Sequence, residues 1–218
     1  MSTLTTPSTP SRSDSRPSGS DPAAWWRYLC WILGDRIAVC GDLPQDRTAA
    51  RHQLREWRRA GVTHILDLRE EWTDEAVVAR HAPEITYHWL GAHDDGGAQD
   101  DTWFDTGVAL ILTALADPDA RIVVHCHMGV NRAPSMAFAA LLALDVDPVA
   151  ALDEIRSARP IANIEYAEDA VAWWQRRTGA PAAAVRDACA TVRAWRVDNP
   201  CDVGWVISRI RVAERHDG

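Results

Sequence analysis

The chain contains no lysine, and it has no hydrophobic run long enough to cross a membrane. Its longest apolar run, residues 137–144, is far shorter than the about 20 residues that a membrane-spanning helix needs. No apolar segment opens the chain, so we expect no secretory signal. Cysteine is scarce, odd in number and widely spaced, at Cys30, Cys40, Cys126, Cys189 and Cys201. These features argue against a disulfide framework and predict a cytoplasmic protein with free thiols.

The charge balance is acidic, with 31 Asp and Glu residues against 23 arginines and a formal net charge of −8. Such a chain is a poor general binder of nucleic acid or of an anionic membrane, so we expect neither as a partner. Its 218 residues, 47% of them hydrophobic, can form the core of one ordinary domain. Residues 1–22 are mostly Ser, Thr, Pro, Gly and charged, a composition that predicts a disordered tail.

The most informative stretch is a short loop with a cysteine near one end and an arginine at the other. It reads HCHMGVNR and runs from His125 to Arg132, between a strand-like run at residues 121–124 and an apolar, helix-like run at residues 136–144. In this setting the backbone N–H groups of the loop and the positive end of the helix converge on an anion. The pattern predicts a cradle for one phosphate, formed by His127, Met128, Gly129, Val130, Asn131 and Arg132.

The residue types at the two ends of the loop suit phosphate chemistry. When no phosphate is bound, the sulfur of Cys126 is the anion nearest to the converging N–H groups, so the thiolate should be favoured and ready to act as a nucleophile. Arg132 offers a planar fork of donors that can hold two phosphoryl oxygens at once, which the point charge of a lysine could not do. Gly129 allows the loop to turn tightly.

This spacing of His-Cys, two residues, Gly, two residues and Arg resembles the signature loop of the protein tyrosine phosphatase superfamily, and its flanks resemble the dual-specificity branch. The resemblance covers residues 37–177 and includes an Arg-Pro segment that ends at Asn163. It implies that Cys126 forms a cysteinyl-phosphate, that Arg132 binds the phosphoryl group, and that His125 orients the loop and helps to keep the thiolate. Asn163 would support the loop, although an Asn before a helical stretch is also commonly just an N-cap.

Members of that superfamily also use an aspartate on a separate loop as general acid. Asp94 follows a strand-like run and lies 126 − 94 = 32 positions before the cysteine, a spacing similar to that of the family. The resemblance implies that Asp94 protonates the leaving oxygen and later deprotonates the water that clears the phosphoenzyme. Asp95 is the neighbouring contender, and an Asp-Asp-Gly-Gly cluster can also be no more than a solvated turn.

Several histidines near the loop invite a metal-binding interpretation, but we expect no metal and no cofactor. His125, Cys126 and His127 are consecutive and would alternate faces in an extended segment. If Cys126 coordinated a metal, the fork of Arg132 would have no role. The other histidines in this group are His88 and His93.

Strand-like and helix-like segments alternate along the chain, which predicts one α/β domain at residues 23–179. Strands are expected at residues 37–40, 62–68, 85–90 and 121–124, and helices at 48–59, from Asp74, after a cap at Asp101, at 136–144, after a cap at Asp147, and at 164–177. The family resemblance implies a small, mainly parallel sheet of four or five strands flanked by helices. Residues 180–218 are predicted to be a helical extension of unknown role, in which residues 205–212 suit a strand or a helix. Nothing indicates an oligomeric state.

The favoured function is hydrolysis of phosphomonoesters in a phosphoprotein or phosphopeptide, above all phosphotyrosine, with phosphoserine and phosphothreonine as further substrates. One alternative is a pseudophosphatase that binds a phosphorylated ligand with weak turnover. Another keeps the chemistry and changes the substrate, because RNA 5′-phosphatases and phosphoinositide phosphatases use the same cradle. The loop has no lysine to meet a polyphosphorylated headgroup, and the acidic chain disfavours RNA.

One departure from the family pattern leads to a prediction. Family members place Ser or Thr directly after the arginine, where the hydroxyl stabilises the departing thiolate, and this chain has Ala133. Ser135 would point roughly 200° away from position 133 on a helix and should not substitute. We expect a burst of leaving group followed by a slower steady state, and faster turnover in Ala133→Ser. Rapid-mixing kinetics tests this, and the absence of a burst with unchanged turnover in the variant would contradict it.

Overall fold

A computed structural model describes residues 22–215, so the tail predicted at residues 1–22 lies outside the described residues except for Pro22. The core is a five-stranded sheet with strand order β1-β2-β5-β3-β4. Its strands are β1 Cys30–Ile32, β2 Ile37–Cys40, β3 His64–Arg69, β4 Thr86–Ala92 and β5 Ile122–His125. Strands β2, β5, β3 and β4 run parallel to one another, and β1 pairs antiparallel with β2. The expected α/β fold with a small, mainly parallel sheet is confirmed, and β1 is an edge strand that the sequence pattern did not predict.

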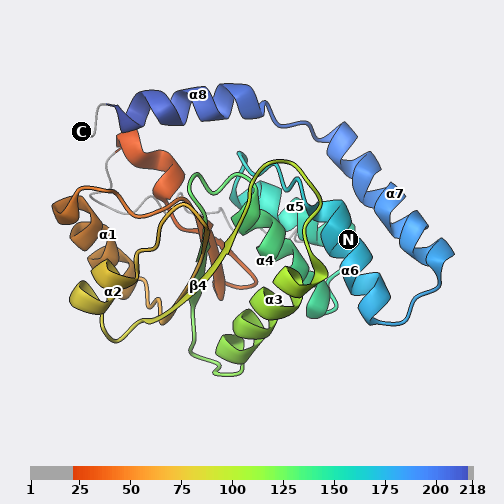
Figure 1. The fold of residues 1–218 in the computed structure, drawn as a ribbon, viewed down its shortest axis with the longest axis horizontal. Coiled ribbons are helices and arrows are strands. Elements are labelled where there is room, and N and C mark those ends of the chain that lie inside the picture. The colour runs from red at the N-terminus through yellow and green to blue at the C-terminus, as the bar shows by residue number, and fades with distance from the viewer. Residues whose placement is uncertain (1–21, 216–218) are drawn as a thin grey trace, which may run out of the picture.

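Helices cover both faces of this sheet (Figure 1). The helical elements are η1 Pro22–Arg27, α1 Arg47–Arg59, α2 Glu75–His81, α3 Asp101–Leu115, α4 Arg132–Ala143, α5 Pro148–Ala158, α6 Ala167–Arg177, α7 Ala182–Asp198 and α8 Val203–Glu214. The helix predicted at residues 136–144 thus begins four residues earlier, at Arg132, and the one predicted at 164–177 begins at Ala167.

Alternation of side chains along the strands creates the two faces. In β2, Ile37 and Val39 belong to the cluster formed with α3 to α6, whereas Ala38 and Cys40 belong to the cluster formed with α1 and α2. The period of two follows from the pleat of a strand, and strands buried on both faces carry almost continuous apolar runs. The result is a sheet between two helical layers, with the carboxyl ends of the parallel strands at one edge.

Aspartates begin several of the helices. Asp46 accepts hydrogen bonds from two backbone N–H groups of α1, and Asp147 does the same for α5, where Pro148 occupies the first helical position as predicted. The predicted cap at Asp101 is wrong by one residue. Asp100 is the N-cap, accepting from the backbone N–H of Thr102 at 2.8 Å, and Asp101 is the first residue of α3.

Helices α7 and α8 arch around one side of the molecule and over the carboxyl edge of the sheet (Figure 1). Helix α7 packs on α6, and its Val192 and Trp195 join the main hydrophobic cluster. The ambiguous segment at residues 205–212 is helical and lies within α8, whose Val206 and Ile210 pack on Trp26 of η1. The domain boundary at residue 179 stays a prediction. Among residues 22–215, no helix combines the length and apolarity needed for a bilayer span.

Candidate active site

The loop with the cysteine connects β5 to α4 at the carboxyl edge of the sheet. Strand β5 ends at His125, Cys126 is 2% exposed, and α4 begins at Arg132. Gly129 has a φ of 62°, and a Cβ there would lie 2.5 Å from the carbonyl carbon of Cys40 and 2.4 Å from a guanidinium nitrogen of Arg159. Both the left-handed backbone and the lack of space therefore require glycine at this position. The loop is as tight as the sequence predicted.

A buried arginine from the end of α5 holds this loop in place. The Arg159 side chain donates from Nε to the carbonyl of Gly129 at 2.5 Å and from Nη2 to that of Met128 at 2.9 Å. Its Nη2 also donates to the carbonyl of Trp26 at 2.7 Å. Main-chain carbonyls that point away from the cradle are thereby satisfied, which leaves the N–H groups free to face an anion.

Arg132 lies between two carboxylates. Its Nη1 and Nη2 donate to the two oxygens of Glu71 at 2.9 and 2.8 Å, and its Nε lies 3.3 Å from Oδ2 of Asp94. Nη1 also donates to the carbonyl of Ala92 at 2.9 Å. Burial by itself would lower the pKa of Arg132, but the hydrogen bonds to Glu71 and the negative charges of Cys126 and Asp94 raise it above its ordinary value. The guanidinium therefore stays charged.

Asp94 is held against the loop by a residue of the loop itself. Its Oδ1 accepts a hydrogen bond from Nδ2 of Asn131 at 2.6 Å and from the hydroxyl of Tyr166 at 3.0 Å. The other end of the Asn131 amide, Oδ1, accepts from the backbone N–H of Glu165 at 2.7 Å. Asn131 thus connects the segment with Asp94 and the start of α6 to the loop between β5 and α4.

The remaining candidates have other surroundings. Asp95 is exposed, and its Oδ1 accepts from the backbone N–H of Gly97 within its own turn, so of the two aspartates only Asp94 meets Arg132. Asn163 contacts the loop through its backbone, donating to the carbonyl of Val130 at 2.7 Å. The hydroxyl of Ser135 contacts Asn131 and accepts from the backbone N–H of Tyr166.

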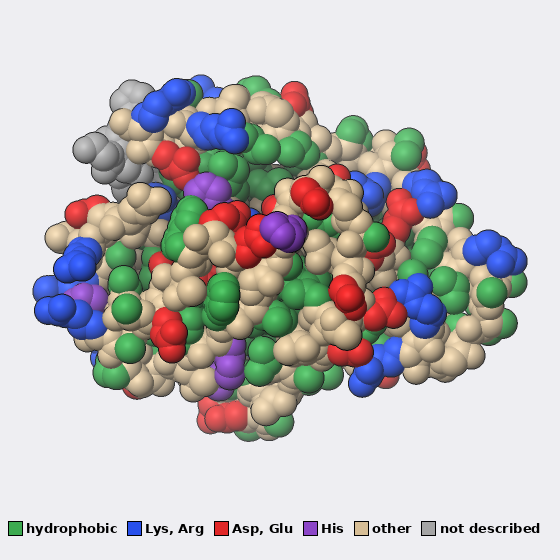
Figure 2. Space-filling view, in the orientation of Figure 1, with side chains coloured by type: hydrophobic (Ala, Val, Ile, Leu, Met, Phe, Trp, Pro, Cys, Tyr) green, Lys and Arg blue, Asp and Glu red, His purple; other side chains and the backbone are tan. Residues whose placement is uncertain are grey.

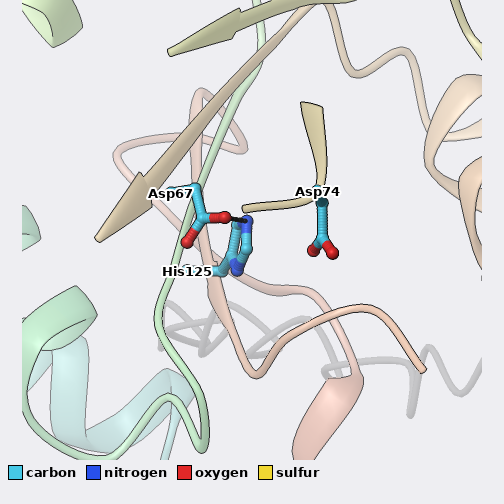
Figure 3. A group of neighbouring side chains, drawn as sticks. All are labelled: Asp67, Asp74 and His125. Atoms are coloured by element: carbon cyan, nitrogen blue, oxygen red, sulfur yellow. Dashed lines mark ion pairs between the residues drawn. The ribbon is translucent and has the colours of Figure 1, made fainter. Parts of the chain in front are cut away.

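His125 lies in a buried polar cluster under the loop (Figure 3). Its side chain is fully buried, neither ring nitrogen has a hydrogen-bond partner within residues 22–215, and Nε2 lies 3.8 Å from Oδ2 of Asp67. Burial lowers the pKa of His125, so the ring is neutral at physiological pH. The role implied by the resemblance, orienting the loop, stays a prediction.

The donor atoms of Asp67, Asp74 and His125 lie within 4.8 Å of one another, as in a metal site. However, the Arg69 guanidinium already donates from Nη2 to Asp67 at 2.6 Å and to Asp74 at 2.5 Å. An internal cation therefore balances these carboxylates, and a divalent ion would have to displace it. Tyr87 adds a further hydrogen bond to Asp67 at 2.6 Å. We interpret the cluster as an ion-pair network that supports the carboxyl ends of β3 and β5.

His127 forms part of the rim of the site. Its Nδ1 donates to Oδ2 of Asp42 at 2.9 Å, its ring meets the Trp72 ring edge to face at 5.3 Å, and Nε2 lies 3.6 Å from Glu214 of α8. The hydrogen bond to Asp42 raises the pKa of His127 above its ordinary value, although burial opposes this. The side chains of Met128 and Val130 pack in the cluster that α8 forms with Trp26.

Known phosphatases are similar to this chain in part of its sequence and in its fold. No family model matches the chain. Dual specificity protein phosphatase 26 of Homo sapiens and of Rattus norvegicus is 33% identical over 88 residues, which are 40% of this chain and 42% of those proteins. The structure of PTPMT1 in complex with PI(5)P aligns with a TM-score of 0.56 and 16% identity over 71% of this chain and 97% of that one. Human DUSP28 aligns with a TM-score of 0.54 and 15% identity, over 66% and 95%.

The fold is therefore that of the protein tyrosine phosphatase superfamily. In sequence, the chain is similar to the dual-specificity branch, and the resemblance given by the HCHMGVNR loop is confirmed. The aligned segment spans about two fifths of the length of the curated relatives, so it does not transfer their whole activity to this chain.

Three residues of the site had no assigned role in the sequence analysis. Glu71 holds Arg132, Asp42 holds His127, and Arg159 holds the loop carbonyls. Arg159 was within the segment that resembles the family, and Glu71 follows a core strand, but neither position carries a pattern that reveals its partner. Only the folded chain brings residues 61 positions apart, such as Glu71 and Arg132, into contact.

The raised pKa of His127 leads to a prediction for stability. Because the folded pKa lies above the unfolded value of about 6.5, protonated His127 stabilises the fold fully below that pH, and its contribution is lost as the pH rises through the folded pKa. Urea unfolding should show that wild type exceeds His127→Gln in stability more at pH 5.5 than at pH 8.5. A stability difference that grows with pH would contradict the prediction, and an NMR titration of His127 measures its pKa directly.

Proposed function

We propose that the protein is a cysteine-dependent phosphatase that hydrolyses phosphomonoesters through a cysteinyl-phosphate intermediate. The observation that carries the proposal is the convergence of Cys126, Arg132 and Asp94: the first two belong to one tight loop, and Nε of Arg132 lies 3.3 Å from Asp94. A nucleophile, a phosphate-binding cation and a proton donor are the groups that phosphoryl transfer to a side chain requires.

In the proposed first step, the Cys126 thiolate attacks phosphorus and the bond from phosphorus to the leaving oxygen breaks. Glu71 occupies the Nη1 and Nη2 edge of the Arg132 guanidinium, so two phosphoryl oxygens would bind at the Nε and Nη2 edge, where they take the place of the Asp94 carboxylate that lies 3.3 Å from Nε. Asp94 gives its proton to the leaving oxygen, because an alkoxide or phenoxide leaves poorly.

In the second step, water attacks phosphorus, Asp94 takes a proton from that water, and the bond between sulfur and phosphorus breaks to return the thiolate and release phosphate. Ala133 offers no hydroxyl to the departing sulfur, and the hydroxyl of Ser135 is already hydrogen-bonded to Asn131 and to the backbone N–H of Tyr166. This second step should therefore limit turnover. Ala133 is also the feature that favours the second candidate function, capture of a phosphorylated ligand with weak turnover.

We propose phosphoprotein as the substrate class, with phosphotyrosine preferred and phosphoserine and phosphothreonine as further substrates. The rim of the site is acidic: Glu70, Glu71, Asp94 and Glu214 all contact the histidines and the arginine around the loop. Figure 2 shows acidic and histidine side chains gathered below α8. These carboxylates repel further phosphates, which disfavours triphosphorylated RNA and a multiply phosphorylated headgroup. Because the similar structure of PTPMT1 was solved in complex with PI(5)P, a phosphoinositide is included among the substrates to be tested. We further propose a cytoplasmic location, where the thiolate stays reduced.

A substrate panel tests the proposal. Phosphotyrosine peptide should release phosphate fastest, phosphothreonine peptide more slowly, and phosphoinositide and triphosphorylated RNA least. Cys126→Ser should abolish release from every substrate, because no nucleophile of equal strength remains. Cys189→Ser, which changes a half-buried cysteine on α7, is the matched control and should keep its activity. Phosphate release by Cys126→Ser would exclude the mechanism, and tight binding without release by wild type would favour the second candidate.

The contact between Asn131 and Asp94 gives a second prediction. Asn131→Ala removes the 2.6 Å hydrogen bond that positions the proposed acid. We expect kcat/KM, which reports the first step, to fall about 10²-fold for aryl phosphates with poor leaving groups and to change little for those with good ones, because only the former need the proton. Asp95→Ala should show no such dependence. Equal losses across the series of aryl phosphates would show that Asn131 acts on the loop and not through Asp94.

A further inference from the structure

A groove of about 320 Å³ lies between α1 and α2, on the face of the sheet opposite α3 to α6. Basic side chains from both helices line it, together with small and apolar ones. The lining residues are Arg47, Thr48, Arg51, Ala76, Val77, Arg80 and His81. A second hollow, of about 570 Å³, lies at the other end of α1 and is bordered by Arg55, Arg58 and Arg59. In Figure 2 basic side chains gather at the left of the molecule, where Figure 1 places α1 and α2.

The arginines of the groove differ from their neighbours on α1. Arg58 pairs with Glu84 and Arg59 with Glu56. In contrast, we find no ion pair or side-chain hydrogen bond among residues 22–215 for Arg47, Arg51 and Arg80 of the groove, or for Arg55 of the second hollow.

Stabilisation of α1 does not explain this arrangement. Arg47, Arg51 and Arg55 are spaced four residues apart, so they project from one side of α1, and like charges at this spacing destabilise a helix. Arg47 is also the first residue of α1, where the helix dipole disfavours a cation. Nor does overall composition explain it, because the chain has a net charge of −8. A positive patch that costs helix stability in an acidic protein calls for an anionic ligand.

We propose that this groove binds an acidic, extended segment of a protein, and that the segment belongs to the phosphoprotein substrate. The second part of this inference rests on the proposed function. Carboxylates suit the planar forks of arginine, which bind them bidentately. Arg47 and Arg51 of the groove and Arg55 of the second hollow follow one another over eight residues, or about 12 Å along α1, a distance that about four residues of an extended chain span.

The groove is continuous in sequence with the active site. Glu71, which holds Arg132, and Trp72, which packs on His127, lie in the loop that leads directly into α2. Asp74 ends that loop and precedes the first residue of α2. A substrate with its phosphoryl group at Cys126 could therefore pass Trp72 and place its acidic segment between α1 and α2.

The surroundings disfavour other anionic partners. A membrane surface would be expected to meet exposed apolar side chains beside the cations, but the exposed large ones are Trp89, Leu144, Val197, Trp205 and Val212, none of them on α1 or α2. Single-stranded nucleic acid would need exposed aromatic rings for stacking. The one aromatic residue of the two helices, Trp57, is 2% exposed.

Binding of an unphosphorylated peptide tests the groove without reference to catalysis. A fluorescent eight-residue peptide rich in Asp and Glu should bind the full chain, with an affinity that falls as salt rises. Arg51→Glu and Arg80→Glu should each weaken binding about tenfold, as expected for the loss of a charged hydrogen bond. Arg51→Lys should give an intermediate loss. Arg186→Glu on α7 makes the same charge change away from the groove and should bind as wild type does.

Kinetics then tests whether the bound segment belongs to the substrate. The ratio of kcat/KM for a phosphotyrosine peptide with the acidic segment to that for one without it should exceed one, and Arg51→Glu should bring it close to one. Peptide binding that is lost equally in Arg51→Glu and Arg186→Glu would overturn the proposal. Tighter, Arg51-dependent binding of phosphatidylserine vesicles or of single-stranded RNA would overturn it in favour of that ligand. Arg51-dependent peptide binding without hydrolysis of any phosphopeptide would instead leave the groove intact and reject the proposed function.

Discussion

Three arginines buried around the loop between β5 and α4 determine the shape of the site. Arg69, Arg132 and Arg159 are no more than 2% exposed, and each uses its planar fork on several partners at once. Arg69 donates hydrogen bonds to Asp67 and Asp74. Arg132 donates to Glu71 and forms an ion pair with Asp94. Arg159 donates to backbone carbonyls of the loop and of η1. A guanidinium keeps its charge when buried, so these contacts persist over the working range of pH. In a chain without lysine, arginine thus supports the loop and is also the cation proposed to bind the phosphoryl group.

The same contacts set how the site meets its ligand. Arg132 faces two carboxylates, so an incoming phosphoryl group reaches the cation only at the edge that Glu71 leaves open, where it displaces Asp94 from Nε. Because Glu71 fixes the orientation of the guanidinium before a ligand arrives, binding does not have to order that side chain. The carboxylates also make the rim negative. On the proposed function, the loop holds one phosphate and the rim repels additional ones, whereas the arginines of α1 and α2 would attract an acidic protein segment.

The sequence predicted the parts of this structure that depend on neighbouring residues. The loop from His125 to Arg132, the parallel core strands and the cap at Asp147 follow from local pattern, because apolar alternation and capping chemistry act over a few positions. The cap at Asp100 was missed because Asp101 beside it has the same chemistry. Glu71 and Arg159 act through partners far along the chain, and no local signal identifies such a partner. Strand β1 is short, and its Trp and Cys side chains suit several structures equally well.

Helix α8 also acts through partners far along the chain, and it lies in the segment whose role the sequence left open. The side chains of Met128 and Val130 in the loop pack with Trp26, Val206 and Ile210, and Glu214 lies beside His127. Side chains of the loop therefore pack against α8, and its backbone N–H groups are the part proposed to bind phosphate. Apolar burial at this contact stabilises the loop in the conformation described here. On this view α8 is part of the site's construction, and the loop cannot be understood as a motif apart from it.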